Sequence, residues 1–109
     1  MATYDQFAEL DIRVGTVLSA EPFPGARKPA IKLTIDFGPL GTKRTSAQIT
    51  KRYDPQSLVG RQVAAVVNFP PKRIAGFVSE VLVLGAVPEE GDVVLLRPDT
   101  AVPNGAPIA

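Results

Sequence analysis

The chain has 109 residues, of which 45% are hydrophobic and 21% charged, and its formal net charge is +1; these values are typical of one globular domain. Histidine and cysteine are absent, which excludes Cys/His metal sites, Ser–His or Cys–His nucleophile pairs and disulfides. No apolar run is long enough to span a membrane, and no signal peptide is visible. We therefore expect a single cytoplasmic domain over residues 1–109 that is not an enzyme, with no catalytic residue, cofactor, metal or membrane insertion.

Charge is distributed unevenly along the chain. Residues 43–73 contain seven basic residues and one acid, residues 80–109 contain five acids and one base, and residues 1–42 carry a net charge of −1. Such segregation favours one face that binds an anionic partner.

The N-terminal segment predicts a short helix. Thr3 and Gln6 have the spacing of a capping box, and a helix through about Leu10 would place Tyr4, Phe7 and Leu10 on one apolar stripe. A helix this short is not stable alone in water. The stripe is expected to dock either on the chain's own barrel or on a partner subunit, and helix length does not separate the two.

Three strands are predicted next. Ile12 to Val17 alternates, but its apolar parity shifts after Gly15, which predicts a bulge or bend there. A turn region from Pro22 to Pro29 precedes Ile31 to Phe37, where hydrophobic and polar residues alternate strictly. Thr42 to Ile49 is expected to form the third strand.

The second half begins with a loop from Lys51 to Gly60 that contains a helical turn, for which Asp54 is the expected cap. Val63 to Phe69 is nearly all apolar and predicts a strand buried on both faces. Lys72 to Phe77 is interpreted as a basic loop. Two further strands, at 81–84 and 93–96, and an extended or irregular tail at 98–109 complete the prediction.

Many short strands with Gly/Pro turns predict an all-β fold. A helical turn between strands three and four favours an OB-fold five-stranded barrel with a short N-terminal helix and an extended C-terminal segment. An SH3-like barrel and a β-sandwich remain open on this evidence.

Two sequence segments resemble the tRNA-binding-domain family of OB-fold modules, which are attached to some aminoacyl-tRNA synthetases and also occur alone. These are the Asp-Ile-Arg-Val-Gly of residues 11–15 and residues 66–79, which match the family's order of Asn, basic residues, an aliphatic, Gly and Ser. One departure concerns RNA contacts: many members have Gly-Met after the Ser-Gln or Ser-Glu pair, whereas Ser79-Glu80 is followed here by Val81-Leu82.

Within this family the chain resembles a branch of bacterial export chaperones. The resemblance lies in residues 46–53, 68–71, 79–85 and 103–105, and extends from about Phe7 to Pro107. It implies a homodimer without catalytic activity that binds unfolded or signal-bearing, pre-export polypeptides, with tRNA as a further partner. The alternative is a tRNA-binding module whose main ligand is structured RNA.

Three sets of candidate residues follow. Basic and polar side chains that could contact RNA are Lys43, Arg44, Lys51, Arg52, Asn68, Lys72, Arg73 and Ser79, with Tyr53 and Phe77 as possible stacking surfaces. Apolar groups that could bind peptide are Phe69, Pro70, Pro71, Ile74 and Phe77. Candidates for dimer contacts are Phe7, Leu10, Val93, Leu95, Val102 and Pro103. For the basic residues the alternative is solvated surface charge, and for Asn68 it is a loop hydrogen bond to backbone. For the peptide candidates the alternative is packing of the barrel end or of the dimer seam.

Overall fold

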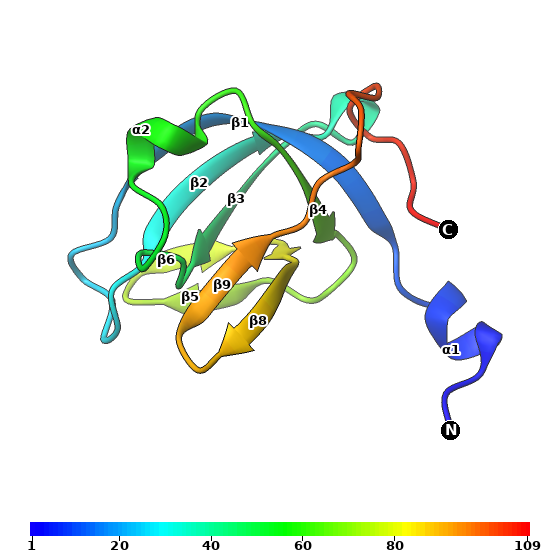
Figure 1. Ribbon diagram of the computed structural model, residues 1–109, viewed down its shortest axis with the longest axis horizontal. Coiled ribbons are helices and arrows are strands. Elements are labelled where there is room, and N and C mark those ends of the chain that lie inside the picture. The colour runs from blue at the N-terminus through cyan, green and yellow to red at the C-terminus, as the bar shows by residue number, and fades with distance from the viewer.

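The computed structural model describes all residues 1–109 and contains nine short strands, two α-helical turns and one 3-10 turn (Figure 1). In chain order the elements are α1 (Tyr4–Ala8), β1 (Ile12–Pro22), β2 (Ile31–Asp36), η1 (Gly38–Leu40), β3 (Thr42–Ala47), α2 (Pro55–Leu58), β4 (Gln62–Val66), β5 (Lys72–Ile74), β6 (Phe77–Ser79), β7 (Leu82–Val83), β8 (Gly85–Glu89) and β9 (Asp92–Leu95).

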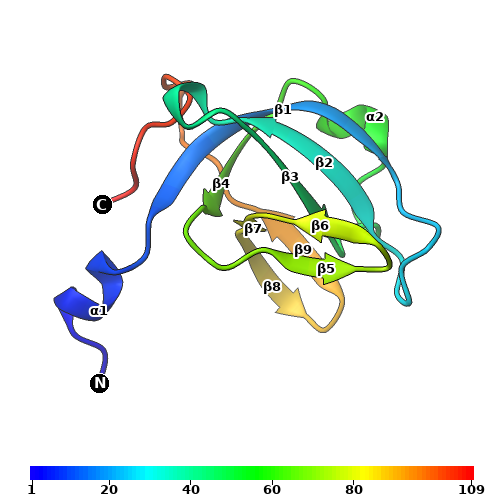
Figure 2. The ribbon, with the colours of Figure 1, turned by 180° about the vertical axis from the view of Figure 1, so that it is seen from behind.

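Five strands form one antiparallel sheet in the order β3-β2-β1-β4-β7, which curls into a nearly closed barrel. The hairpins β5-β6 and β8-β9 lie across its lower end (Figures 1 and 2). With α2 between β3 and β4, this is the predicted OB-fold barrel.

The bend in β1 differs in detail from the prediction at Gly15. The register against β2 shifts between Val17 and Ser19, so the irregularity lies just beyond the predicted position. Gly15 has another role, because a Cβ there would lie 2.6 Å from Ile35 Cγ2 and 2.8 Å from the Phe37 ring. Glycine at this point lets β1 cross close over the core.

The core fills the barrel with alternate residues from its strands. Ile31, Leu33, Ile35 and Phe37 are fully buried, which confirms the strict alternation predicted for β2. The strand β4 is buried on both faces, as predicted, but it ends at Val66 rather than at Phe69.

Two cap predictions are confirmed. Thr3 and Gln6 form a complete capping box on α1, and Asp54 accepts a hydrogen bond from the Ser57 N–H at the start of α2. Each cap satisfies N–H groups that a helix start leaves unpaired.

The predicted basic loop at 72–77 is instead a hairpin. Lys72 pairs with Ser79 and Ile74 with Phe77, and the two turn residues Ala75 and Gly76 have φ of 48° and 79°. Positive φ at both positions is the geometry of a type I′ turn, which matches the twist of the flanking strands.

The C-terminal tail is irregular, as predicted, and lies against β1. Val14 and Ala106, Gly105 and Val14, and Ile108 and Ile12 are joined by backbone hydrogen bonds of 2.7–3.0 Å. The helix α1, by contrast, projects away from the barrel (Figures 1 and 2), and none of its residues is buried. No helix in the structure has the length and apolar character needed to cross a membrane.

Candidate functional site

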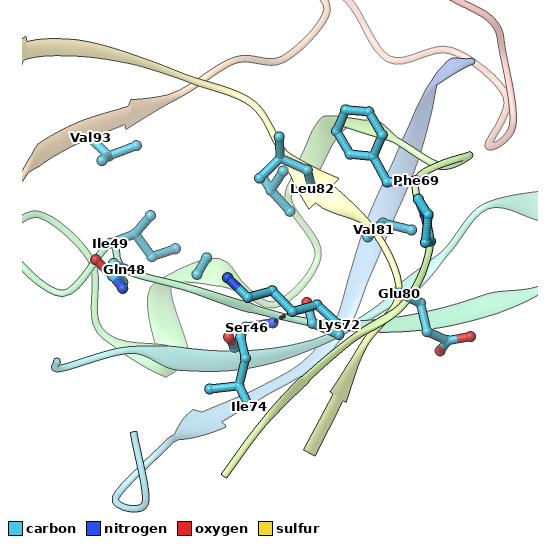
Figure 3. Close-up of a pocket in the computed structure, with 14 residues that line it drawn as sticks. Ser46, Gln48, Ile49, Phe69, Lys72, Ile74, Glu80, Val81, Leu82 and Val93 are labelled. Carbon is cyan, nitrogen blue, oxygen red and sulfur yellow. Dashed lines mark hydrogen bonds between the residues drawn. The ribbon is translucent and has the colours of Figure 1, made fainter. Parts of the chain in front are cut away.

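A groove of about 420 Å³ opens between the end of β3, the β5-β6 hairpin and β7 (Figure 3). Its lining combines eight hydrophobic residues with six polar, charged or Pro residues: Ser46, Ala47, Gln48, Ile49, Phe69, Pro70, Lys72, Ile74, Ser79, Glu80, Val81, Leu82, Val83 and Val93. We refer to this lined space as the groove.

The apolar wall of the groove is partly open to solvent. Phe69 and Leu82 leave 42% and 50% of their surface open to solvent, and they lie on the same side of the groove in Figure 3. Exposed apolar surface of this kind marks an interaction site. Of the peptide candidates, Phe69, Pro70 and Ile74 line the groove, whereas Pro71 is exposed outside it.

Phe77 lies elsewhere. It is buried in a small cluster with Phe23 and Ala30, and its ring meets that of Phe23 edge-on at 5.4 Å between centroids. Its side chain is therefore available neither to the groove nor to stacking bases, and of its predicted roles the structure shows packing in the barrel.

Hydrogen bonds fix the hairpin wall of the groove to β3. Ser79 Oγ lies 2.9 Å from Thr45 Oγ1 and accepts from the Ser46 N–H at 3.3 Å. The Glu80 N–H donates to the Arg44 carbonyl, and Glu80 Oε1 accepts from the Arg44 N–H. Ser79 is thus already engaged within the protein rather than presented to RNA.

Lys72 is the one basic residue of the groove lining, and Glu80 is the one acidic residue. Figure 3 shows the Lys72 side chain extending over the groove, while Glu80 points the other way. The three ion pairs of the structure involve other residues, so the Lys72 ammonium has no carboxylate partner.

A second feature, which we call the cation face, consists of Phe23, Phe77, Lys32 and Arg44. The Lys32 ammonium lies 4.8 Å from the centroid of Phe23 and 5.3 Å from that of Phe77. The Arg44 guanidinium lies 4.5 Å from the Phe77 centroid. Cation–π contacts hold both charges in place, and neither has an acidic partner.

Lys51 and Arg52 differ from the other basic RNA candidates because each forms an ion pair with an acidic residue. Lys51 Nζ pairs with Glu89 at 2.9 Å, and Arg52 donates two hydrogen bonds to Asp92 at 2.5 and 2.8 Å. The hydrogen bond from Arg52 lowers the pKa of Asp92, while burial opposes that effect, and the same bond raises the pKa of Arg52. The basic and acidic segments therefore neutralise each other partly, by pairing across the loop before α2 and the β8-β9 hairpin.

Asn68 and Tyr53 have internal partners as well. Asn68 Oδ1 accepts from the Asp11 N–H at 2.9 Å, and its Nδ2 donates to the Glu9 carbonyl at 2.8 Å. The Tyr53 hydroxyl accepts from the Leu95 N–H, and Arg61 lies 5.4 Å from the Tyr53 ring centroid. Among the RNA candidates, Lys43, Arg44, Lys72 and Arg73 remain without acidic partners.

The dimer candidates divide by exposure. Phe7, Leu10 and Pro103 are exposed and Val102 is half-buried, whereas Leu95 is buried in the core and Val93 lines the groove. The side chain of Leu95 is therefore closed to a second copy of the chain.

Sequence reasoning missed Lys32, Phe23 and Leu82. Lys32 alternates outward on β2, a pattern that by itself indicates only the polar face of a core strand. Its position opposite Ser46, diagonal to Arg44, depends on the β2-β3 register. An available signal was that Lys32 and Arg44 are both basic residues at outward positions of adjacent strands.

The structure contains no cluster of three or more His, Cys, Asp or Glu residues placed to hold a metal ion. A barrel with an apolar groove, a hairpin wall and an aromatic-backed pair of cations defines the chain as an OB-fold binding module.

Comparison with known proteins agrees with this class. Residues 12–107 match the family model described as "Putative tRNA binding domain", and the chain belongs to this family. Over the full chain, the fold superposes on chaperone CsaA from Bacillus anthracis with a TM-score of 0.97, 64% identity and 99% coverage of that chain. For the CsaA chaperone protein of Picrophilus torridus the TM-score is 0.93, the identity 50%, and both chains are fully covered.

Curated relatives include a methionine–tRNA ligase of Methanothrix thermoacetophila, 46% identical over 105 residues. The match covers 96% of this chain but only 15% of the ligase. The similarity thus concerns one binding domain of a much longer enzyme, and the two CsaA structures are described as chaperones rather than as catalytic domains.

Proposed function

We propose that the protein is a chaperone of the CsaA type that binds unfolded or pre-export polypeptides in the groove. The observation that carries the proposal is the exposed apolar wall formed by Phe69 and Leu82 beside a cavity large enough for side chains. Exposed apolar groups in clients would bury surface there. The similarity to CsaA structures supports the same ligand class.

The test compares groove and control variants in suppressing aggregation of a chemically unfolded client protein. Phe69→Ser and Leu82→Ser should each weaken protection and peptide affinity about tenfold, since each removes a contact of about 1.5 kcal/mol. Val87→Ser is the matched control, because Val87 is 60% exposed on β8 and outside the groove. Equal activity of all three variants would exclude the groove as the client site.

A second function, tRNA binding, is favoured by the cation face. Lys32 and Arg44 are held over aromatic rings and lack acidic partners, so both charges are available to phosphates. Membership in the tRNA-binding family supports this ligand.

Titration of labelled tRNA at several salt concentrations tests this second function. Arg44→Gln should weaken binding and reduce the slope of log affinity against log salt by about one. Lys51→Gln is the control, since Lys51 is paired with Glu89 and its loss should change the slope less. Absence of tRNA binding even at low salt would reject the proposal.

We also propose that the protein is located in the cytoplasm, the compartment in which tRNA and pre-export polypeptides occur together. We propose further that it forms a homodimer. The helix ends at Ala8 rather than at about Leu10. Tyr4 and Phe7 of α1, and Leu10 just after it, are all open to solvent, which supports a partner-covered surface. Of the two docking modes open from the sequence, packing on the chain's own barrel is not seen, since no residue of α1 is buried.

A further inference from the structure

The groove coincides with the place where the barrel fails to close. β3 and β7 are the two ends of the five-stranded sheet, and the chain of antiparallel pairings between them makes them parallel to each other. Side chains close the start of this seam, where Thr45 Oγ1 donates to the Val81 carbonyl at 2.7 Å. Beyond that contact the seam opens into the groove between Ala47 and Val83.

The backbone of Val83 faces this opening. Leu84 donates its N–H to Ala64 of β4 at 2.9 Å, and backbone directions alternate between the two sides of a strand. By this alternation Val83 directs its N–H and C=O groups toward the seam, on the same side as the Val81 carbonyl, which accepts the bond from Thr45. No backbone hydrogen bond joins Val83 to β3.

An unpaired sheet edge beside apolar walls is a template for an added strand. Main-chain hydrogen bonds hold such a ligand irrespective of its sequence, and alternate side chains enter the apolar space. A site that must accept many clients benefits from such main-chain pairing, because its affinity then derives from backbone groups that every polypeptide carries.

Charge narrows the choice of ligand further. The unpaired Lys72 ammonium extends over the groove, whereas the Glu80 side chain points away from it and accepts the backbone N–H of Arg44 at 3.0 Å. A carboxylate on the client would complement Lys72, and a basic residue at the same point would be repelled.

We propose that the client segment lies in the groove as an extended strand paired with Val83 of β7, with an acidic residue beside Lys72. This inference rests on the proposed chaperone function and adds the conformation and charge of the bound segment.

Backbone-modified peptides test the strand pairing. The probe is a soluble, labelled peptide of alternating valine and serine with one aspartate, in two N-methylated forms that block the odd or the even amides. A strand paired along one edge uses only alternate amides, so one form should bind about tenfold more weakly than the unmodified peptide and the other nearly unchanged. Equal affinities of both forms would overturn the inference. Failure of the unmodified peptide to bind, together with failure to protect unfolded clients, would reject the underlying function instead.

Reversing the charge at position 72 tests whether an acidic residue of the client lies beside Lys72. Lys72→Glu should reverse the preference between the aspartate peptide and an otherwise identical lysine peptide. Lys28→Glu, an exposed change outside the groove, should leave the preference as it is in the wild type. If Lys72→Glu retains the wild-type preference, the acidic residue does not lie beside Lys72. Binding of apolar peptides by either variant serves as the check that the groove is intact.

Discussion

At the level of single residues, the Arg52–Asp92 ion pair connects the basic segment, residues 43–73, to the acidic segment, residues 80–109. The side chain of Asp92 is only 6% exposed, and both of its oxygens accept hydrogen bonds from Arg52. A buried carboxylate needs such partners to stay ionised, and removing them would leave an uncompensated charge. The pair therefore connects the loop before α2 to the β8-β9 hairpin and contributes to the shape of the barrel end.

Its effect on stability should depend on pH. The hydrogen bond from Arg52 lowers the pKa of Asp92 in the folded state. The contribution of this carboxylate is therefore present above its unfolded pKa of about 3.9 and is lost as the pH falls through the lower folded value. We expect the melting temperature of the wild type to fall more steeply below about pH 4 than that of Asp92→Asn. Parallel curves from neutral to acidic pH would show that the pair contributes nothing to acid sensitivity.

At the level of elements, the β5-β6 turn is the part of the groove wall that has an unfavourable residue. Ala75 has a φ of 48°, a conformation that costs alanine about 1 kcal/mol and that asparagine tolerates better. We expect Ala75→Asn to raise the free energy of unfolding by about 0.5–1 kcal/mol, measured by urea denaturation. Gly76→Ala, at a φ of 79°, is the opposite control and should lower the free energy of unfolding. Stabilisation by the second change would contradict the assigned turn.

Local patterns predicted the elements whose signals are local. The capping box of α1, the Asp54 cap of α2 and the alternation of β2 all involve residues within one turn or one strand. The β5-β6 hairpin was missed because Ala75-Gly76 lacks the usual Asn-Gly signature and lies between basic residues.

The site could be predicted only where its residues are neighbours in sequence. Phe69, Pro70 and Ile74 were identified because they cluster along the chain. The burial of Phe77 depends on Phe23, and the neutralisation of Lys51 depends on Glu89. Contacts between residues so distant in sequence follow from strand register and hairpin placement, which local spacing does not encode.

For the whole molecule, the two chain ends differ in how they are held. The tail is bonded to β1 and anchored by Asn104, whose side chain accepts from Thr16 Oγ1 at 2.7 Å. The helix α1 is attached mainly through Asn68, which bonds to Glu9 and Asp11. A short helix held by hydrogen bonds just beyond its end, with its apolar side chains in solvent, is expected to be covered by another molecule.

The dimer proposal predicts that Phe7→Asp produces a monomer. In a two-fold symmetric dimer the same change occurs twice in the interface, so a loss of about 2 kcal/mol per side would raise the dissociation constant about a thousandfold. Sedimentation of the wild type and the variant at micromolar concentration measures this change. The barrel itself should fold normally, because Phe7 has no contact with the buried core. Val87→Asp, on the exposed surface of β8, should leave the assembly unchanged. A monomeric wild type, or a Phe7→Asp variant that sediments as a dimer, would contradict the dimer contact proposed for α1 and would mean that its exposed apolar residues have another partner. If the wild type is a monomer, client polypeptide added to it should protect Phe7 from solvent.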